Sequence, residues 1–200
     1  MNMRSAIFQA IVLAILLAGC TAQVPMPDLN YPVNAVKRDA TVTVVIDRDT
    51  LNHQFEIGSN LYKSRFQTGM LLKLVAETEL SPMFTRYTFE TGYHEPGRSG
   101  TDITLVLKLK EYQLHGVHTK DSIALVPEAG YIVLATAYNR DGTRLFNNVY
   151  VGKALHQLSY WSLSNSEAKI IRDPSLEALK QIFGKLRVDL DKVLTVTRSR

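Results

Sequence analysis

Cysteine is almost absent from this chain, and so is any large excess of charge. Cys20 is the only cysteine, so no disulfide can form within one chain and the fold must depend on packing. There are 23 basic and 19 acidic residues, which give a net charge of +4. These charges are scattered along the sequence, so no strongly charged binding segment stands out. The hydrophobic share of 46% is typical of a globular protein with a sizeable core.

Sequence motifs of common enzymes are also missing. A nucleophile elbow needs Gly-x-Ser-x-Gly, and Arg98-Ser99-Gly100 lacks that frame. A zinc protease helix needs His-Glu-x-x-His, and His94-Glu95-Pro96 breaks it at once. No glycine-rich phosphate loop ending in Lys-Ser or Lys-Thr is present, and Asp47 and Asp49 are expected to be solvated turn residues. The sequence therefore predicts a protein that is not an enzyme, with no cofactor and no catalytic residue.

The N-terminal segment has the three parts of a secretory signal. Arg4 is the only charged side chain before Cys20, and an apolar run follows from Ala6 to Ala18. A membrane-spanning helix needs roughly 20 apolar residues, which is more than this run supplies. We therefore predict that residues 1–19 are a signal peptide.

The tetrapeptide Leu17-Ala18-Gly19-Cys20 resembles the lipobox of bacterial lipoproteins. This resemblance implies that the Cys20 thiolate accepts a diacylglyceryl group, that the Gly19–Cys20 bond is cut, and that the new amino terminus can be acylated. Two or three acyl chains hold a protein stably, since each buried methylene contributes about 0.8 kcal/mol. Thr21 stands where an aspartate commonly retains enterobacterial lipoproteins in the inner membrane. We therefore expect a lipid anchor on Cys20, on the periplasmic side of the outer membrane, where nucleic acid is not a partner.

Prolines are concentrated just after the cysteine. Pro25, Pro27 and Pro32 disfavour a helix and favour an extended chain. From residue 21 to residue 38 such a chain reaches roughly 50 Å, at about 3.1 Å per residue. Residues 20–39 are thus predicted to be a lipidated tether. The alternative is that apolar side chains of this segment pack onto the domain: Met26, Leu29, Tyr31 and Val33.

Residues 40–200 are predicted to form a single α+β periplasmic domain. Alternation of apolar and polar residues predicts strands at 41–47, 51–57, 83–91, 101–114, 131–138 and 143–152, with turns at 47–49 and 139–142. A period of three to four residues predicts helices at 61–80 and 174–193, the second with Asp173 as N-cap and Pro174 in the first position. Residues 155–172 are ambiguous and can hold a short helix capped at Ser164. This order predicts a two-layer sandwich in which two main helices cover one face of an antiparallel or mixed sheet.

Three groups of residues are candidate binding features, each with a plainer structural explanation. His115 and His118, near Glu111 and Asp121, have a spacing that suits a metal but lack a third ligand, so no metal site is predicted. The aromatic residues Tyr150, Tyr160 and Trp161 either anchor a partner or close the edge of the core. The basic residues of helix 174–193 suit docking on the sheet better than insertion into a membrane: Lys180, Lys185, Arg187 and Lys192.

The lipobox, the proline-rich segment and the element order together resemble several groups of small envelope lipoproteins, namely the YajG-like, LptE and LpoB groups. This resemblance concerns layout, and no motif is matched residue by residue. It implies a structural or assembly factor for an outer-membrane or cell-envelope complex, with an envelope protein as partner. The alternative is a lipoprotein that binds lipid, glycan or lipopolysaccharide. Homo-oligomerisation stays open.

Overall fold

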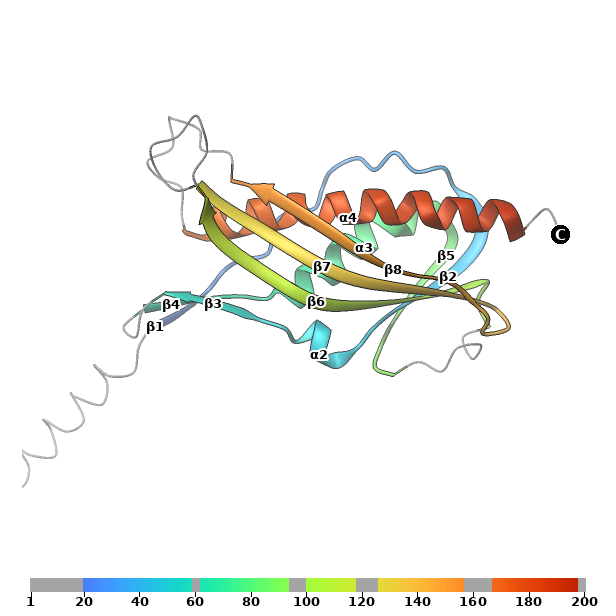
Figure 1. Ribbon diagram of the computed structural model, residues 1–200, viewed down its shortest axis with the longest axis horizontal. Coiled ribbons are helices and arrows are strands. Elements are labelled where there is room, and N and C mark those ends of the chain that lie inside the picture. Colours follow the sequence, from blue (N-terminus) through green and yellow to red (C-terminus); the bar gives the residue numbers. More distant parts are fainter. Residues whose placement is uncertain (1–19, 59–61, 94–99, 118–125, 157–166, 198–200) are drawn as a thin grey trace, which may run out of the picture.

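The computed structural model describes residues 20–58, 62–93, 100–117, 126–156 and 167–197. These ranges form two β-sheets and three α-helices (Figure 1). The strands are β1 (Cys20–Gln23), β2 (Arg38–Ile46), β3 (Phe55–Gly58), β4 (Tyr62–Phe66), β5 (Phe84–Thr91), β6 (Ile103–Val117), β7 (Val126–Asn139) and β8 (Arg144–Leu155). The helices are α2 (Arg48–Leu51), α3 (Thr68–Leu80) and α4 (Glu167–Thr197), with a 3-10 turn at Ser81–Met83.

The larger sheet has five strands in the order β5-β2-β6-β7-β8. It is mixed, because β2 runs parallel to β5 and β6 whereas β6, β7 and β8 are antiparallel. The predicted hairpin of β7 and β8 is confirmed. Its turn is closed by the Asn139 side chain, which accepts hydrogen bonds from the backbone of Asp141 and Thr143, and by Gly142 at a φ of 79°.

Both long helices cover the same face of this sheet. The Lys73 ammonium of α3 lies 4.8 Å from the ring centroid of Phe89 on β5, and α4 contacts β8 at Gly152. Phe89 of β5 is in register with Val44 of β2, and Val44 is in register with Leu105 of β6. Leu105 and Val133 lie on the same face of the paired strands β6 and β7, and Val133 is in register with Tyr150 of β8, two residues before Gly152. Both helices therefore contact the same face of the sheet. α3 packs beside α4, as Figure 1 shows. The prediction of two helices on one face is confirmed in part.

The core lies between these helices and the sheet. Its largest side chains have no exposed surface, and they come from strands and helices alike: Leu105, Leu107, Tyr131, Leu71, Leu72, Leu179, Ile182 and Phe183. Burial of side chains of this size contributes roughly 1.5–3 kcal/mol each. The alternation that predicted the strands therefore places one face of each strand in this core.

The second sheet was not predicted, and its strand β4 corrects the expected helix at 61–80. Tyr62–Phe66 alternates, with Ser64 and Phe66 buried and Lys63 exposed, so a period of two decides this segment. The helix begins only at Thr68. The three strands are ordered β1-β4-β3, with β1 parallel and β3 antiparallel to β4. The expected helix start at residues 59–60 lies outside the described residues.

Two short elements after β2 also differ from expectation. The predicted turn at 47–49 is the start of the one-turn helix α2, and Asp47 is its N-cap: the carboxylate accepts a hydrogen bond from the Thr50 amide at 2.6 Å. The predicted strand at 51–57 is confined to β3, because α2 occupies the chain up to Leu51.

Helix α4 begins at Glu167, so the prediction that Pro174 occupies its first position is wrong. A proline inside a helix removes one backbone hydrogen bond, which opposes continuation through it. Tertiary packing outweighs this loss, because Ile171, Pro174 and Ser175 are all buried. The Ser175 hydroxyl also donates to the Ile171 carbonyl at 2.5 Å. The expected cap at Ser164 lies outside the described residues.

Residues 24–37, between β1 and β2, lie against the domain. Val24 is 4% exposed and belongs to the core, while Met26, Leu29 and Ala35 are partly buried against it. We call this segment the strap. The prediction of a tether is therefore corrected in favour of the alternative of packing, because the apolar side chains of this segment gain burial against the core.

Candidate anchor site and exposed surfaces

Cys20, the predicted lipidation site, is the first residue of strand β1. Its register partner in β4 is Tyr62, and pairing continues through Gln23 opposite Arg65. The Val24 amide then donates to the Arg65 carbonyl at 2.9 Å, and the Val24 side chain enters the core. The chain is thus part of a sheet from the predicted anchor residue onward.

An ion-pair cluster lies on the strands beside Cys20. Glu56 of β3 accepts from Arg65 at 2.6 Å and lies 3.6 Å from the Lys63 ammonium. The hydrogen bond from Arg65 holds the pKa of Glu56 below its usual value. Among the described residues the cluster leaves one excess positive charge on this face of the small sheet, while Ile57, in register with Ser64 on the opposite face, is 37% exposed.

The strap is tied to the helices by a buried carboxylate. Glu79 of α3 is 4% exposed; it accepts a hydrogen bond from the Tyr31 hydroxyl at 3.0 Å and lies 3.3 Å from Arg187 of α4. Burial, followed by the Glu79 charge, raises the pKa of Tyr31. The Lys180 ammonium lies 4.3 Å from the centroid of the Tyr31 ring. The hydrogen bond from Tyr31 to Oε1 and the ion pair of Arg187 with Oε2 offset part of the cost of burying the Glu79 charge.

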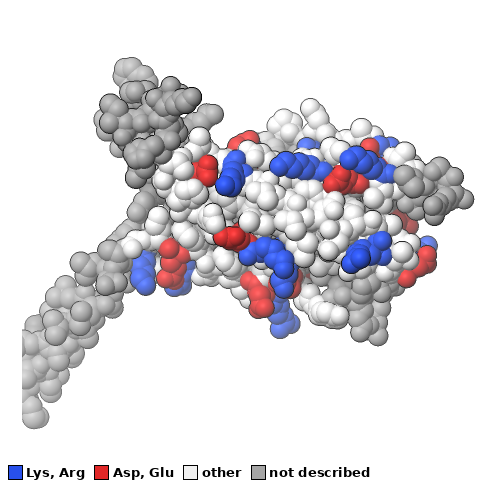
Figure 2. All heavy atoms as spheres, in the orientation of Figure 1, with Lys and Arg blue, Asp and Glu red and all other residues white. Residues whose placement is uncertain are grey.

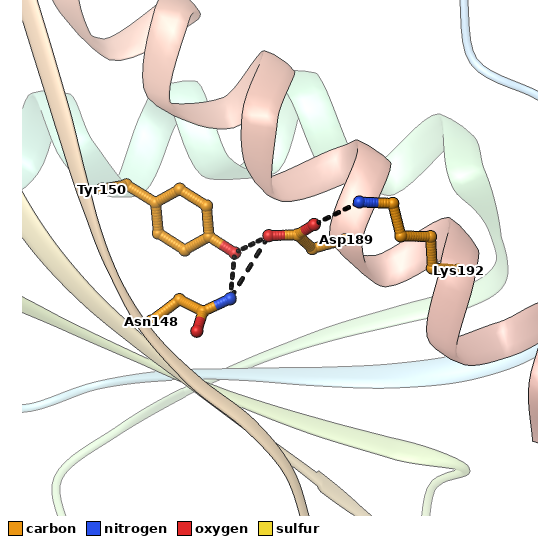
Figure 3. A network of polar contacts seen from close by, with 4 residues as sticks. All are labelled: Asn148, Tyr150, Asp189 and Lys192. Atoms are coloured by element: carbon orange, nitrogen blue, oxygen red, sulfur yellow. Dashed lines mark hydrogen bonds and ion pairs between the residues drawn. The ribbon is translucent and has the colours of Figure 1, made fainter.

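A second polar network joins α4 to strand β8 (Figure 3). The Tyr150 hydroxyl donates to Asp189 at 2.8 Å, and the Asn148 amide reaches the same oxygen at 3.3 Å. Lys192 lies 3.1 Å from the other oxygen. Burial raises the pKa of Tyr150 to about 12, and the hydrogen bond from Tyr150 is the main cause that lowers the pKa of Asp189. This network fastens the helix to the sheet.

The basic residues of α4 are engaged within the protein, as the docking interpretation expects. Lys180 contacts Tyr31, Arg187 pairs with Glu79, and Lys192 pairs with Asp189. Lys185 donates to the Val151 carbonyl of β8 at 2.9 Å, where Gln181 accepts from the Lys153 amide at 3.3 Å. The last two contacts cover part of the outer edge of the sheet, which would otherwise be open to pairing. On the face drawn in Figure 2, basic and acidic side chains are interspersed.

The other candidates are only partly within the described chain. His115 lies 3.2 Å from Glu128, whereas His118 and Asp121 lie outside the described residues. In the described ranges no three histidine, cysteine or acidic side chains gather at metal-binding distances. Tyr150 faces α4 and closes the edge of the core, while Tyr160 and Trp161 are outside the described residues.

Two features were missed by the sequence analysis. The first is His156, which is 6% exposed and lines a hollow of about 560 Å³ with Asp173 and Glu177; within the described residues neither of its ring nitrogens has a hydrogen-bond partner. Both carboxylates already have basic partners, in Arg172 and Lys180. No spacing in the sequence signals this grouping, because β8 and α4 bring it together.

The second missed feature is an apolar patch on the face of β7 and β8 opposite α4. Val149 and Val151 are 59% and 40% exposed. Their register partners in β7 are Leu134 and Ile132, which are half-buried. Since Tyr150 and Gly152 face α4, alternation directs these valines away from it. That alternation was visible in the sequence, but which face the helix covers was not.

No protein-family model matches this chain, and no curated protein matches its sequence. A hypothetical protein of Chlamydia trachomatis is similar in structure over 78% of this chain and 98% of its own, with 7% identity and a TM-score of 0.39. A minor lipoprotein of Acinetobacter baumannii aligns over 74% and 93%, with 10% identity and a TM-score of 0.36. An uncharacterized lipoprotein of Nitrosomonas europaea aligns over 86% and 96%, with 12% identity and a TM-score of 0.39. All three TM-scores are below 0.5, so these likenesses support no conclusion about this chain.

None of the helices in the described ranges has the length and apolar character needed to cross a membrane.

Proposed function

We propose that this chain is a lipid-anchored cell-envelope protein that acts as a structural or assembly factor by binding another envelope protein. The lipobox at Leu17–Cys20 supports the anchor, and Thr21 supports the outer-membrane location. Catalysis is not part of the proposal, since the one acidic pair noted in the sequence contains Asp47, whose carboxylate caps α2.

The observation that carries the proposal is the apolar patch. Four branched apolar side chains lie together on two neighbouring strands, and the two valines are exposed: Ile132, Leu134, Val149 and Val151. Single exposed apolar residues are ordinary on protein surfaces, whereas contiguous ones are typical of sites that bind other proteins. No described helix or strand packs over this part of the sheet. A partner that covers the patch would remove the valines from water.

The interior favours this function over a carrier of lipid or glycan. A carrier needs a cavity large enough to hold its ligand, and the walls of such a cavity would retain accessible surface. Between the described helices and the sheet, Leu107, Tyr131 and Phe183 have none. The space in which an α+β sandwich would most simply hold an apolar ligand is therefore filled by side chains.

The proposal is tested by photo-crosslinking in intact cells. A photoreactive residue at Val149 is expected to form an adduct with one discrete envelope protein. The Val149→Lys variant is expected to complement a strain that lacks this protein less well than the parent does. The matched control is Val188, a 55% exposed valine on α4, where the crosslinker and Val188→Lys should have no effect. Failure of Val149 to crosslink, an adduct only with a second copy of this chain, or equal effects at both valines would overturn the proposal.

A further inference from the structure

We infer that the folded domain is held directly on the bilayer, with the β1-β4-β3 sheet in the headgroup layer and no tether between lipid and fold. This inference rests on the lipid anchor on Cys20 in the proposed function. It concerns where the domain lies once anchored, which the presence of a lipid does not determine. The surface that binds is the small sheet, and the partner is the phospholipid headgroup region.

The first observation is that no free chain separates Cys20 from the fold. Cys20 is paired with Tyr62 in register, and the four residues of β1 end where Val24 enters the core. At about 3.3 Å per residue, β1 covers about 13 Å. A lipid on the Cys20 sulfur therefore brings β1 and its neighbours β4 and β3 to the membrane surface.

The second observation is that the strap is not a flexible linker, because it is bound to the domain along its length. It is fastened at its start by Val24, in its middle by the hydrogen bond from Tyr31 to Glu79, and at its end by Arg38. The Arg38 Nε donates to Asp191 of α4 at 2.7 Å. Releasing the strap would expose Val24 and leave the buried Glu79 carboxylate without the Tyr31 hydroxyl. The described structure therefore opposes conversion of the strap into a tether.

The side chains next to the anchor suit a headgroup layer. Lys63 is in register with Thr21, one residue beyond Cys20, and its side chain is 47% exposed. Among the described residues Lys63 and Arg65 share a single acidic partner, Glu56, so one positive charge is available to lipid phosphates. Ile57 is in register with Ser64, so its side chain lies on the opposite face of the small sheet from Lys63 and Arg65, and its exposed fraction of 37% makes it an accessible position from which to locate this sheet.

This placement also limits how far the domain reaches. β1 lies at one end of the long axis of the molecule, and α4 runs along that axis to the other end (Figure 1). The 31 residues of α4 span about 46 Å at about 1.5 Å per residue. Without a tether, the surface of a protein partner that contacts this domain must lie within about that distance of the membrane.

Fluorescence quenching on vesicles tests the inference. Because the lipidated Cys20 has no free thiol, Ile57→Cys and, separately, Val188→Cys each provide a single labelling site on purified lipidated protein. The protein is bound to vesicles of phosphatidylethanolamine and phosphatidylglycerol that contain a lipid spin-labelled at its headgroup. We expect loss of most fluorescence from the label at position 57 and little loss from position 188. A flexible 20-residue Gly-Ser linker placed after a duplicated Thr21 should abolish quenching at position 57.

The outcomes separate the inference from the proposed function. Mass spectrometry of the purified protein must show the diacylglyceryl group on Cys20, and Cys20→Ser should lose both the lipid and vesicle binding. Absence of the lipid would overturn the anchor itself. A lipidated, folded protein whose label at position 57 is quenched no more than the label at 188 would overturn only the inference of direct contact. Strong quenching at position 57 that is equal with and without the linker would overturn the inference that the short link from Cys20 holds the sheet on the bilayer.

Discussion

Gly152 brings strand β8 and helix α4 closer together than a residue with a side chain would allow. A β-carbon at this position would lie 2.0 Å from the Ala178 carbonyl oxygen and 3.0 Å from Ile182. The obstacle is helix backbone, which cannot move aside as a flexible side chain can. This one residue therefore determines how closely α4 lies on the edge of the sheet, and with it the geometry of the Tyr150–Asp189 network.

We predict that Gly152→Ala destabilises the protein by about 1–3 kcal/mol through overpacking. The matched control is Gly184→Ala in α4, because a β-carbon there meets no atom within 4 Å. Since alanine is favoured over glycine inside a helix by roughly 0.5–1 kcal/mol, that variant should be more stable than the parent. Urea unfolding of the three proteins measures both effects, and changes of the same sign would contradict this explanation.

At the scale of elements, the strap links both helices without forming regular structure. Its prolines exclude a helix, and its contacts with α3 and α4 come from single side chains. The Tyr31 hydroxyl is the main polar contact, because it meets a carboxylate that is almost fully buried. The strap is therefore expected to contribute to stability through this hydrogen bond as well as through Val24.

We predict that Tyr31→Phe lowers the free energy of unfolding by about 1.5 kcal/mol, the lower end of the range for hydrogen bonds to a charged group, because Tyr31 stays partly exposed. Tyr93→Phe is the control, since Tyr93 is 93% exposed. Thermal and urea unfolding compare the two variants with the parent. Equal stabilities for Tyr31→Phe and Tyr93→Phe would show that the strap is not held by the Glu79 contact.

The elements that were predicted well are those in which local pattern and tertiary packing agree. Strands β6 to β8 alternate over part of their length, and one face of each meets the core, so period and burial give the same answer. Strand β4 was missed because its five residues precede α3 directly, and the apolar residues of both fit a helical period. The start of α4 was missed because the local preference of Pro174 is outweighed by its burial. Local rules fail where packing contributes more than propensity.

At the scale of the whole molecule, buried tyrosines make stability sensitive to alkaline pH. Burial raises the pKa of Tyr112 and of Tyr131, which are 7% and 0% exposed. A raised folded-state pKa means that the unfolded chain loses these protons first. The contribution of these two tyrosines to the free energy of unfolding is therefore complete below pH 10, the ordinary pKa of tyrosine, and decreases as the pH rises above that value.

We predict that the free energy of unfolding is constant from pH 8 to about 9.5 and then falls, by up to about 1.4 kcal/mol per pH unit for each fully buried tyrosine. Urea unfolding at a series of pH values measures the slope. Tyr112→Phe should reduce it, although the hydroxyl contact with Ser175 at 3.0 Å is lost as well. A stability that stays constant to pH 11 would contradict the prediction.

The anchor and the apolar patch belong to different parts of the molecule. Cys20 is at one end, in the small sheet, while the patch lies on the five-stranded sheet, on the side away from the helices. An anchored domain would thus leave the patch free to meet a partner beside the membrane. This arrangement connects the proposed function with the inferred contact between small sheet and bilayer.

The sequence by itself determined the lipobox prediction, the α+β class and the strands of the larger sheet, because each depends on neighbouring residues or a short period. Only the tertiary structure decided that residues 24–37 pack as a strap, that Cys20 begins a strand, and which face of β8 is left open. Those outcomes depend on contacts between residues far apart in the chain, such as Tyr31 with Glu79 and Gly152 with Ala178. An alternating pattern of polar and apolar residues predicts that one face of an element will be buried. Which other element buries that face depends on the tertiary contacts of the whole folded chain.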